Sequence, residues 1–239
     1  MTVEEQIYQL VSNANPVNPM EYVASIVRPL MRNRIDEYLQ TDEDIQSEYS
    51  IRSITKGDSQ ASVLLIGEHI IESQLSLGKE TVYPFEGTEE KELLDKIIEA
   101  YHINPNQLFY MNIINQYPSI NVNGKILYRP PTSEELAIGK DYVNIMIECL
   151  QPVLIILMGN IALNAFKKGI IQQERGNWFE IKGIQTMPTY SPSFLLEMEK
   201  KHQDIVEEYQ IEFAEDMRKA FCYVQDNFKG NVLLEHLEA

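Results

Sequence analysis

Cysteine is scarce in this chain, with Cys149 and Cys222 the only thiols in 239 residues. Each falls in a predicted helix among apolar neighbours, so we expect both to be buried and reduced. Two cysteines without a nearby pair of histidines are a weak basis for a metal site. Their number also argues against an iron–sulfur cluster held by four cysteine ligands. We therefore expect neither a metal nor a cofactor.

Long apolar runs and glycine-rich loops are missing as well. No apolar stretch approaches the roughly 20 residues that a membrane-spanning helix needs. The first residues, Met1-Thr2-Val3-Glu4-Glu5, are acidic and unlike a signal peptide, so we expect a soluble, cytoplasmic protein without membrane contact. Neither of the standard glycine-rich phosphate loops occurs. No serine or cysteine stands with a histidine in a recognisable nucleophile motif.

Basic residues are few relative to acidic ones, 20 against 36, which gives a net charge of −16. This balance argues against a broad phosphate-binding surface, although a local one stays possible. The acid is concentrated at residues 36–48, 86–92 and 197–216. We interpret these segments mainly as solvated helix faces. A dedicated role of these acidic segments, such as mimicking nucleic acid, is the alternative.

One stretch that is present organises the rest of the chain. Four apolar residues, 63–66, are followed at once by Gly67, Glu68 and His69. A short apolar run of this kind is typical of a strand buried on both faces of a parallel sheet. Ligands of open α/β sheets bind just beyond the carboxyl ends of such strands. Gly67 and Glu68 are therefore either the wall of a ligand site or an ordinary turn with a solvated carboxylate.

Strand and helix patterns alternate along the remainder. Strands are predicted at residues 61–66, 107–114 and 153–158, and helices at 20–39, 89–101, 133–150, 160–166 and 204–228. Residues 184–187 form either a fourth sheet strand or a hairpin with 178–181. Alternation of this kind predicts a mainly parallel sheet covered by helices on both faces, an α/β fold. Residues 1–60 lack a strong strand signal and are interpreted as a helical extension of a domain at 61–239.

Three local features complete this reading of the secondary structure. Pro29 lies inside the first helical pattern and is expected to kink or split it. Residues 116–132 are expected to form a long loop, with a turn at Asn123-Gly124. Ser133 is predicted to cap the next helix, whose first turn carries two glutamates.

Polar and aromatic residues follow several of the predicted strands. Asn112 offers donors and an acceptor that could read the edge of an amide-like base, unless it is a satisfied core amide. Phe85, on a turn, either stacks on a planar ligand or belongs to the core. Glu68 could orient water or stabilise a positive, sugar-like transition state. Ser191 lies in a rigid loop that either meets a phosphate or is only a Ser-Pro turn.

Six segments occur in the order of a known family. They are Gly67-Glu68-His69, Pro84-Phe85-Glu86-Gly87, Tyr110-Met111-Asn112-Ile113-Ile114, and residues 129–136, 152–162 and 188–196. Together they resemble the uracil-DNA glycosylase superfamily, and most closely its iron–sulfur branch, family 4. The resemblance covers roughly residues 60–228, and the last segment, which begins Pro188-Thr189-Tyr190-Ser191, is its most specific part.

The resemblance implies a three-layer α/β/α sandwich around a mainly parallel, four-stranded sheet, with a pocket for an extruded uracil at the strand ends. Gly67, Phe85 and Asn112 would then bind the base, Phe85 by stacking and Asn112 by reading its edge. Glu68 would position water or the base. Pro192 and Ser193, with Ser191, would press on the DNA backbone. The expected partner is DNA that contains uracil or a modified base.

The chain departs from the family pattern at two places that bear on activity. The histidine of the last segment is Ser191 here, and the loss of one preorganised donor costs on the order of 10²–10³ in rate. His69 stands in the first segment, where the family has no histidine, and could replace it. Two cluster cysteines are replaced by Gln116 and Gly139. The extension at residues 1–60 could brace the fold in place of the cluster.

Three functions follow. The first is a divergent glycosylase that hydrolyses the N-glycosidic bond of uracil or a related base in DNA, with Glu68, His69 and Ser191 as its catalytic residues. The second is a weak or inactive relative that binds nucleic acid or protein as a subunit in replication or repair. The third is a purely protein-binding module with an acidic face.

Overall fold

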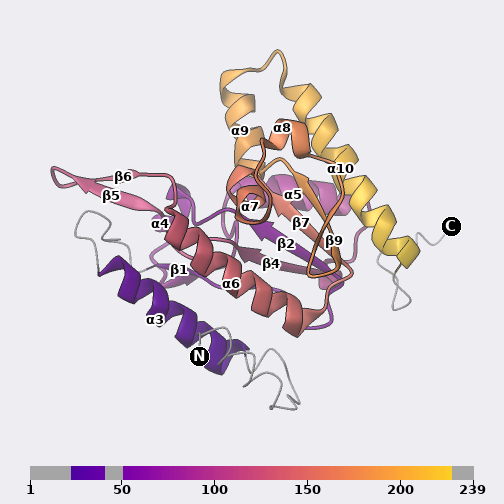
Figure 1. The fold of residues 1–239 in the computed structure, drawn as a ribbon. Helices are drawn as coiled ribbons and strands as arrows, with labels where there is room; N and C mark the ends of the chain where they lie inside the picture. Colours follow the sequence, from indigo (N-terminus) through magenta and orange to yellow (C-terminus); the bar gives the residue numbers. More distant parts are fainter. Residues whose placement is uncertain (1–22, 41–50, 228–239) are drawn as a thin grey trace.

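The structure, a computed structural model, describes residues 23–40 and 51–227 (Figure 1). Three predicted segments extend beyond these ranges. The parts that lie outside are residues 20–22 of the helix predicted at 20–39, residues 41–48 of the acidic segment at 36–48, and residue 228 of the helix predicted at 204–228. Within the described residues no helix has both the length and the apolar character to cross a membrane.

A five-stranded sheet with the strand order β4-β2-β7-β9-β8 forms the centre of the fold. Its strands are β2 (Val63–Gly67), β4 (Leu108–Asn112), β7 (Leu154–Met158), β8 (Phe179–Ile181) and β9 (Ile184–Thr189). The first four in this order run parallel, whereas β8 pairs antiparallel with β9. The predicted four-stranded parallel sheet is therefore present, but β8 adds an edge strand to it. Both interpretations of residues 178–187 hold, since β9 is a sheet strand and also one arm of a hairpin.

Strands β2, β4 and β7 are buried along their whole length, which explains their unbroken apolar runs. Because side chains alternate across a strand, Leu64 and Ile66 face one helical layer, and Val63 and Leu65 face the other. The first layer contains α3, α6 and α7, and the second contains α5, α9 and α10. Figure 1 shows α6 in front of the sheet and α5 behind it. The predicted three-layer α/β/α arrangement is confirmed.

The helices vary widely in length, and the short ones lie in the connections. They are η1 (Val23–Val27), α3 (Arg28–Leu39), α4 (Glu72–Leu75), α5 (Glu89–Ala100), η3 (Pro105–Gln107), α6 (Ser133–Leu150), α7 (Asn160–Phe166), α8 (Ile171–Glu174), α9 (Pro192–Lys201) and α10 (Val206–Asn227). The long ones match the predicted helices within a few residues. Helix α9 was not predicted, because the Ser-Pro-Ser segment that starts it was interpreted as a loop.

The segment at 116–132 is not the expected loop. Strands β5 (Ser119–Val122) and β6 (Lys125–Tyr128) pair antiparallel across Asn123-Gly124 and form a hairpin that projects from the body (Figure 1). Both turn residues have positive φ, 54° and 78°, as a two-residue turn that matches strand twist requires. Helix α6 is capped by Thr132 rather than Ser133, because the Thr132 hydroxyl accepts a hydrogen bond from the Glu135 amide.

The prediction that both cysteines are buried was wrong. Cys222 is exposed on α10 and Cys149 is partly exposed on α6. The buried stripe of α10 runs through Phe213, Met217 and Val224, and Cys222 lies off this stripe.

The described part of the N-terminal extension packs on the main domain. Met31, Ile35 and Leu39 of α3 join the core beside α6. Pro29 lies in the first turn of α3, directly after the single π-turn η1, so the predicted interruption is present. Strand β1 (Arg52–Ser53) pairs with β3 (Thr81–Val82) of the main domain. The boundary at residue 60 stays a prediction.

Candidate functional site

The carboxyl ends of β2 and β4 lie next to each other at one edge of the sheet. Gly67 and Asn112 are partners in the parallel register, so both strands end at the same level. The chain then leaves each strand as a loop, and this is the position where ligands of open α/β sheets bind. The sequence placed its first candidate residues here, and the register confirms that they meet.

Gly67, Phe85 and Asn112 converge at a single point. A side-chain carbon at Gly67 would lie 2.5 Å from Asn112 Oδ1 and 2.9 Å from the Phe85 ring, so no larger residue fits. Phe85 is buried and has a φ of 62°, a conformation that costs energy for an aromatic residue and is often found at functional sites. Its carbonyl accepts a hydrogen bond of 2.7 Å from the Thr88 hydroxyl. The backbone of the turn thus places the ring against Gly67.

Asn112 has an unfilled hydrogen-bond acceptor at this point. Its Nδ2 donates to Ser53 Oγ at 3.1 Å, whereas its Oδ1 is buried and has no partner. An unmet buried acceptor costs about 1–3 kcal/mol, so a ligand that donates a hydrogen bond here would recover that free energy. Ser53 fixes the orientation of the amide. Sequence patterns could not reveal it, because Ser53 lies in the extension, far from Asn112 along the chain.

The Glu68 side chain points toward the start of α7, the helix that follows the neighbouring strand β7. Its Oε1 accepts a hydrogen bond of 2.8 Å from the Ile161 amide, in the first turn of that helix. Burial raises the pKa of the Glu68 carboxyl from 4.5 to about 7, although the Ile161 hydrogen bond opposes this. The carboxylate also packs over Gly159, whose φ of 102° suits glycine and whose missing side chain leaves room for Glu68. Glu68 therefore exists in both protonation states near neutral pH.

The His69 ring packs against the hairpin. Its Nδ1 lies 2.7 Å from the Ile70 carbonyl oxygen, so Nδ1 carries the proton and Nε2 is an acceptor in the neutral ring. Burial lowers the pKa of His69, which favours this neutral form. The ring centroid lies 5.2 Å from that of Tyr128 on β6. A neutral histidine with this tautomer can accept a proton from water but cannot donate one from Nε2.

Ser191 begins α9 as its N-cap. Its Oγ accepts a hydrogen bond of 3.2 Å from the Phe194 amide, and Pro192 is buried in the first turn. Ser193 donates to Glu90 Oε1 at 3.2 Å. These bonds tie the segment to its own helix and to α5, not to Gly67 or Asn112. A phosphate close to Ser193 would also meet the Glu90 carboxylate.

The strand that leads into Ser191 is held by a buried ion pair. Arg175 donates to both oxygens of Asp216 on α10, at 2.9 and 2.8 Å. Thr189, the last residue of β9, donates to the same carboxylate at 2.8 Å. The network fixes the end of β9 and hence the start of α9. None of these partners was predicted from the sequence.

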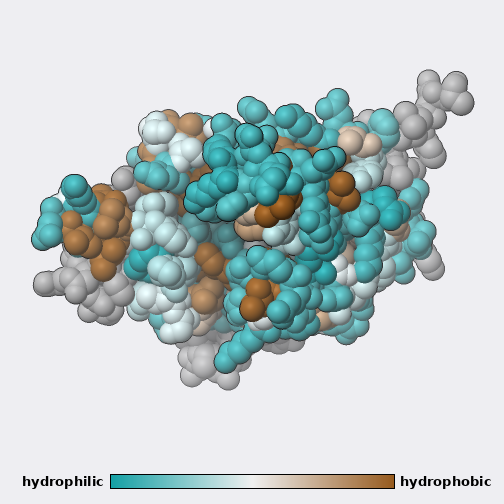
Figure 2. Space-filling view, turned by 90° about the horizontal axis from the view of Figure 1, so that it is seen from above, coloured by the Kyte–Doolittle hydropathy of each residue, from teal (hydrophilic) through white to brown (hydrophobic). Residues whose placement is uncertain are grey.

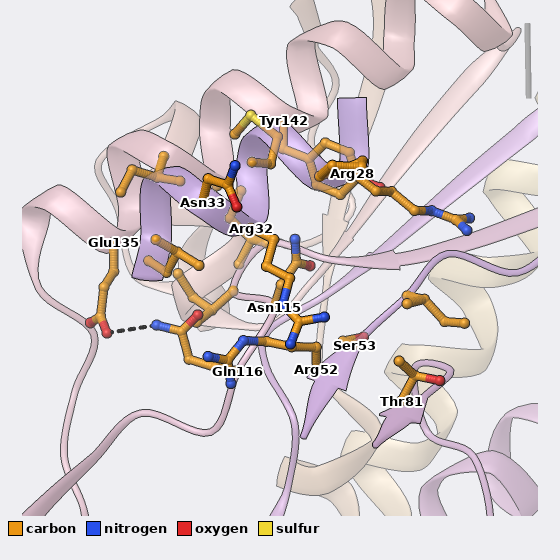
Figure 3. A pocket seen from close by; sticks show the side chains of 18 of the residues that line it. Arg28, Arg32, Asn33, Arg52, Ser53, Thr81, Asn115, Gln116, Glu135 and Tyr142 are labelled. Atoms are coloured by element: carbon orange, nitrogen blue, oxygen red, sulfur yellow. Dashed lines mark hydrogen bonds between the residues drawn. The ribbon is translucent and has the colours of Figure 1, made fainter. Parts of the chain in front are cut away.

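A cavity of about 470 Å³ lies between α3 and α6 (Figure 3); Ser53 lines it, whereas Gly67, Phe85 and Asn112 do not. Gln116 and Gly139 line it, the two positions at which the resemblance placed cluster cysteines. Gln116 donates to Glu135 at 2.9 Å, and the same carboxylate forms a paired contact with Arg129. No cysteine lines the cavity, and among the described residues no three side chains of the metal-binding types gather. These residues do not fit a four-cysteine cluster.

Polar contacts hold the extension together and join it to the main domain beside this cavity. Within the extension, Arg28 of α3 donates to Thr55 at 2.5 Å, and Arg52 of β1 pairs with Asp36 at 2.8 Å. Arg34 forms an ion pair with Asp141 of α6. Contacts between α3 and α6 on the side where a cluster would be expected fit the bracing role predicted for the extension.

A family model and one relative indicate the same family. A model of the "Uracil DNA glycosylase superfamily" matches residues 54–218. A type-4 uracil-DNA glycosylase of Thermotoga maritima is 28% identical over 147 residues, which cover 60% of this chain and 70% of that protein. A DNA polymerase of Bacillus phage SP01 is 29% identical over 132 residues, which cover 55% of this chain but 13% of the polymerase. The matched residues include all the strand-end residues described above except Ser53.

Proposed function

The chain belongs to the uracil DNA glycosylase superfamily, and from this premise we propose that it hydrolyses the N-glycosidic bond of uracil, or of a closely related base, in DNA. The observation that carries the proposal is the unfilled Oδ1 of Asn112 beside the Phe85 ring. An acceptor and an aromatic face at one point are the two features that recognise an extruded base.

Uracil complements this arrangement better than cytosine does. Uracil carries a hydrogen on N3, which donates to Asn112 Oδ1, whereas N3 of cytosine is an acceptor and would face a second acceptor. A pairing of two acceptors leaves both polar groups unsatisfied, at a cost of about 1–3 kcal/mol for each. Phe85 stacks on the ring of either base and adds affinity without this selectivity.

The proposed reaction breaks the bond between C1′ of the sugar and the base nitrogen. The base departs with the electron pair, water adds to C1′, and the proton released by water neutralises the departing base. The ionised form of Glu68 orients that water or stabilises the positive sugar. Its pKa of about 7 leaves a substantial ionised fraction at neutral pH. Neither His69 nor Ser191 offers a charged donor to the leaving base, so we expect slow turnover.

Single-turnover cleavage tests this function. A uracil-containing single strand is incubated with excess protein, and abasic product is measured after alkaline cleavage. The Asn112→Ala variant should lose about tenfold or more of the rate, because it lacks the base-reading acceptor. Asn115→Ala is the matched control, because Asn115 lines the cavity between α3 and α6 and not the point where Gly67, Phe85 and Asn112 meet, so the rate should stay unchanged. Absence of product from the parent protein at high excess would refute the proposal.

Binding without turnover is the second candidate. Two observations favour it: the Ser191 hydroxyl already caps α9, and part of a phage DNA polymerase is similar to this chain. The protein would then recognise a base, or act as a subunit in replication or repair. Affinity for uracil-DNA that Asn112→Ala weakens, together with no abasic product, would identify this function.

A further inference from the structure

The β5–β6 hairpin has an apolar face that projects from the body. The antiparallel register places Ile120 opposite Leu127 and Val122 opposite Lys125, so these side chains share one face. Val122 is 43% exposed and Leu127 is 48% exposed. Figure 2 shows this region as a brown, hydrophobic projection at the left end of the molecule. Exposed apolar residues scattered singly are ordinary, but a group on a protruding hairpin indicates a contact surface.

The root of the hairpin lies against the candidate site. Tyr128, at the end of β6, packs on His69, the residue after Glu68, with ring centroids 5.2 Å apart. Tyr117, just before β5, lies 6.0 Å from the Tyr128 ring. The chain also enters the hairpin from Asn112 by way of the loop after β4. The root of the hairpin therefore lies beside both strands that build the base-reading point.

The charge around the hairpin differs from that of the rest of the chain. Residues 100–133 contain no Asp or Glu, although the chain has 36 of them. The same segment carries Lys125 near the turn, whereas Arg129, directly after β6, is paired with Glu135. A polyanion such as DNA is repelled least where carboxylates are missing. The hairpin is thus suited to approach nucleic acid.

We propose that the face formed by Ile120, Val122 and Leu127 inserts into the base stack of duplex DNA, next to the nucleotide extruded into the site. This inference rests on the proposed function. Extrusion of a base from a duplex costs a few kcal/mol, and apolar side chains wedged between base steps offset part of that cost. A base in a single strand needs no such help. The hairpin should therefore matter for duplex DNA and not for single strands.

A double variant, Val122→Thr with Leu127→Thr, removes the apolar surface but keeps strand-forming residues. Its single-turnover rate on a uracil-containing duplex should fall about tenfold or more, whereas its rate on the same single strand stays within about twofold of the parent. Ile211→Thr is the control, because Ile211 is equally exposed, at 53%, on helix α10. Equal losses on both DNA forms, no loss on the duplex, or the same loss in the control would overturn the proposal.

A second measurement separates this inference from the proposed function. If the parent protein cleaves no single strand, the proposed function fails, and affinity replaces rate as the readout. The probe is then a duplex with a tetrahydrofuran abasic site, compared with its single strand. Weaker binding of the double variant to the duplex alone supports the wedge. Equal binding by variant and parent, as expected for a hairpin that docks a protein, or no binding of either DNA by the parent, overturns it.

Discussion

Replacement of Glu68 by glutamine removes a carboxyl that burial holds partly protonated at neutral pH. The amide oxygen of glutamine can still accept the hydrogen bond from Ile161, so the shape of the site is preserved. The folded carboxyl keeps its proton up to about pH 7, whereas the unfolded one releases it near 4.5. Between these values the folded state binds more protons. The contribution of Glu68 to stability is thus complete below the unfolded pKa and is lost as pH rises through the folded one.

The magnitude follows from the two pKa values. The difference between 4.5 and about 7 corresponds to about 3 kcal/mol in full, of which about 2.5 kcal/mol falls between about pH 5 and about pH 8. We therefore expect the free energy of unfolding of Glu68→Gln, relative to the parent, to rise by about 2.5 kcal/mol over this range. Other carboxyls titrate alike in both proteins and cancel in the comparison.

Urea unfolding of the parent and the variant at the two pH values measures this difference. Glu134→Gln serves as the control, because Glu134 is exposed in the first turn of α6. Its difference from the parent should change little with pH. A Glu68→Gln difference that is flat, or that falls as pH rises, would show that Glu68 is not held in its neutral form by burial.

Two further substitutions test the parts of the fold that hold the site. Gly159→Ala should lower the free energy of unfolding, measured in urea, by about 2 kcal/mol or more, because the added carbon meets Glu68 and the φ of 102° disfavours alanine. The same substitution made in the Glu68→Ala variant should cost less, because the side chain that it meets is then absent. An equal cost in both proteins would contradict the predicted collision. Asp216→Asn should lower the free energy of unfolding by about 3 kcal/mol in the same assay, since it leaves Arg175 without its buried partner. A loss below about 1 kcal/mol would mean that the ion pair with Glu212 is enough to neutralise Arg175.

Sequence patterns predicted the strands and long helices because burial on two faces leaves a continuous apolar run, as at residues 63–66. The meeting of Gly67 and Asn112 was also predictable, since the ends of neighbouring parallel strands meet at one edge, whereas Phe85 reaches them from a turn. Ser53 was not, because its contact with Asn112 joins distant parts of the chain. Nor was the use of Ser191 as a cap, which depends on α9 starting directly after it.

The hairpin shows a different limit of sequence reasoning. The turn at Asn123-Gly124 was recognised, but the short flanking runs, bounded by prolines, were assigned to a loop. Short strands outside the main sheet bury little surface, so their apolar alternation is weak. Only the paired register shows that Ile120, Val122 and Leu127 lie on one face.

Recognition of a base and cleavage of its bond depend on different parts of this site. Under the proposed function, recognition rests on Asn112, which presents an unfilled acceptor next to the Phe85 ring. For cleavage, the proposed function relies on Glu68 to supply charge to water or to the sugar, and neither His69 nor Ser191 is a cationic donor for the departing base. His69 is neutral, with its proton on Nδ1, and the Ser191 oxygen is engaged by its own helix. Mutation of Asn112 should therefore weaken binding and turnover together, whereas mutation of Glu68 should lower turnover and leave base binding largely intact.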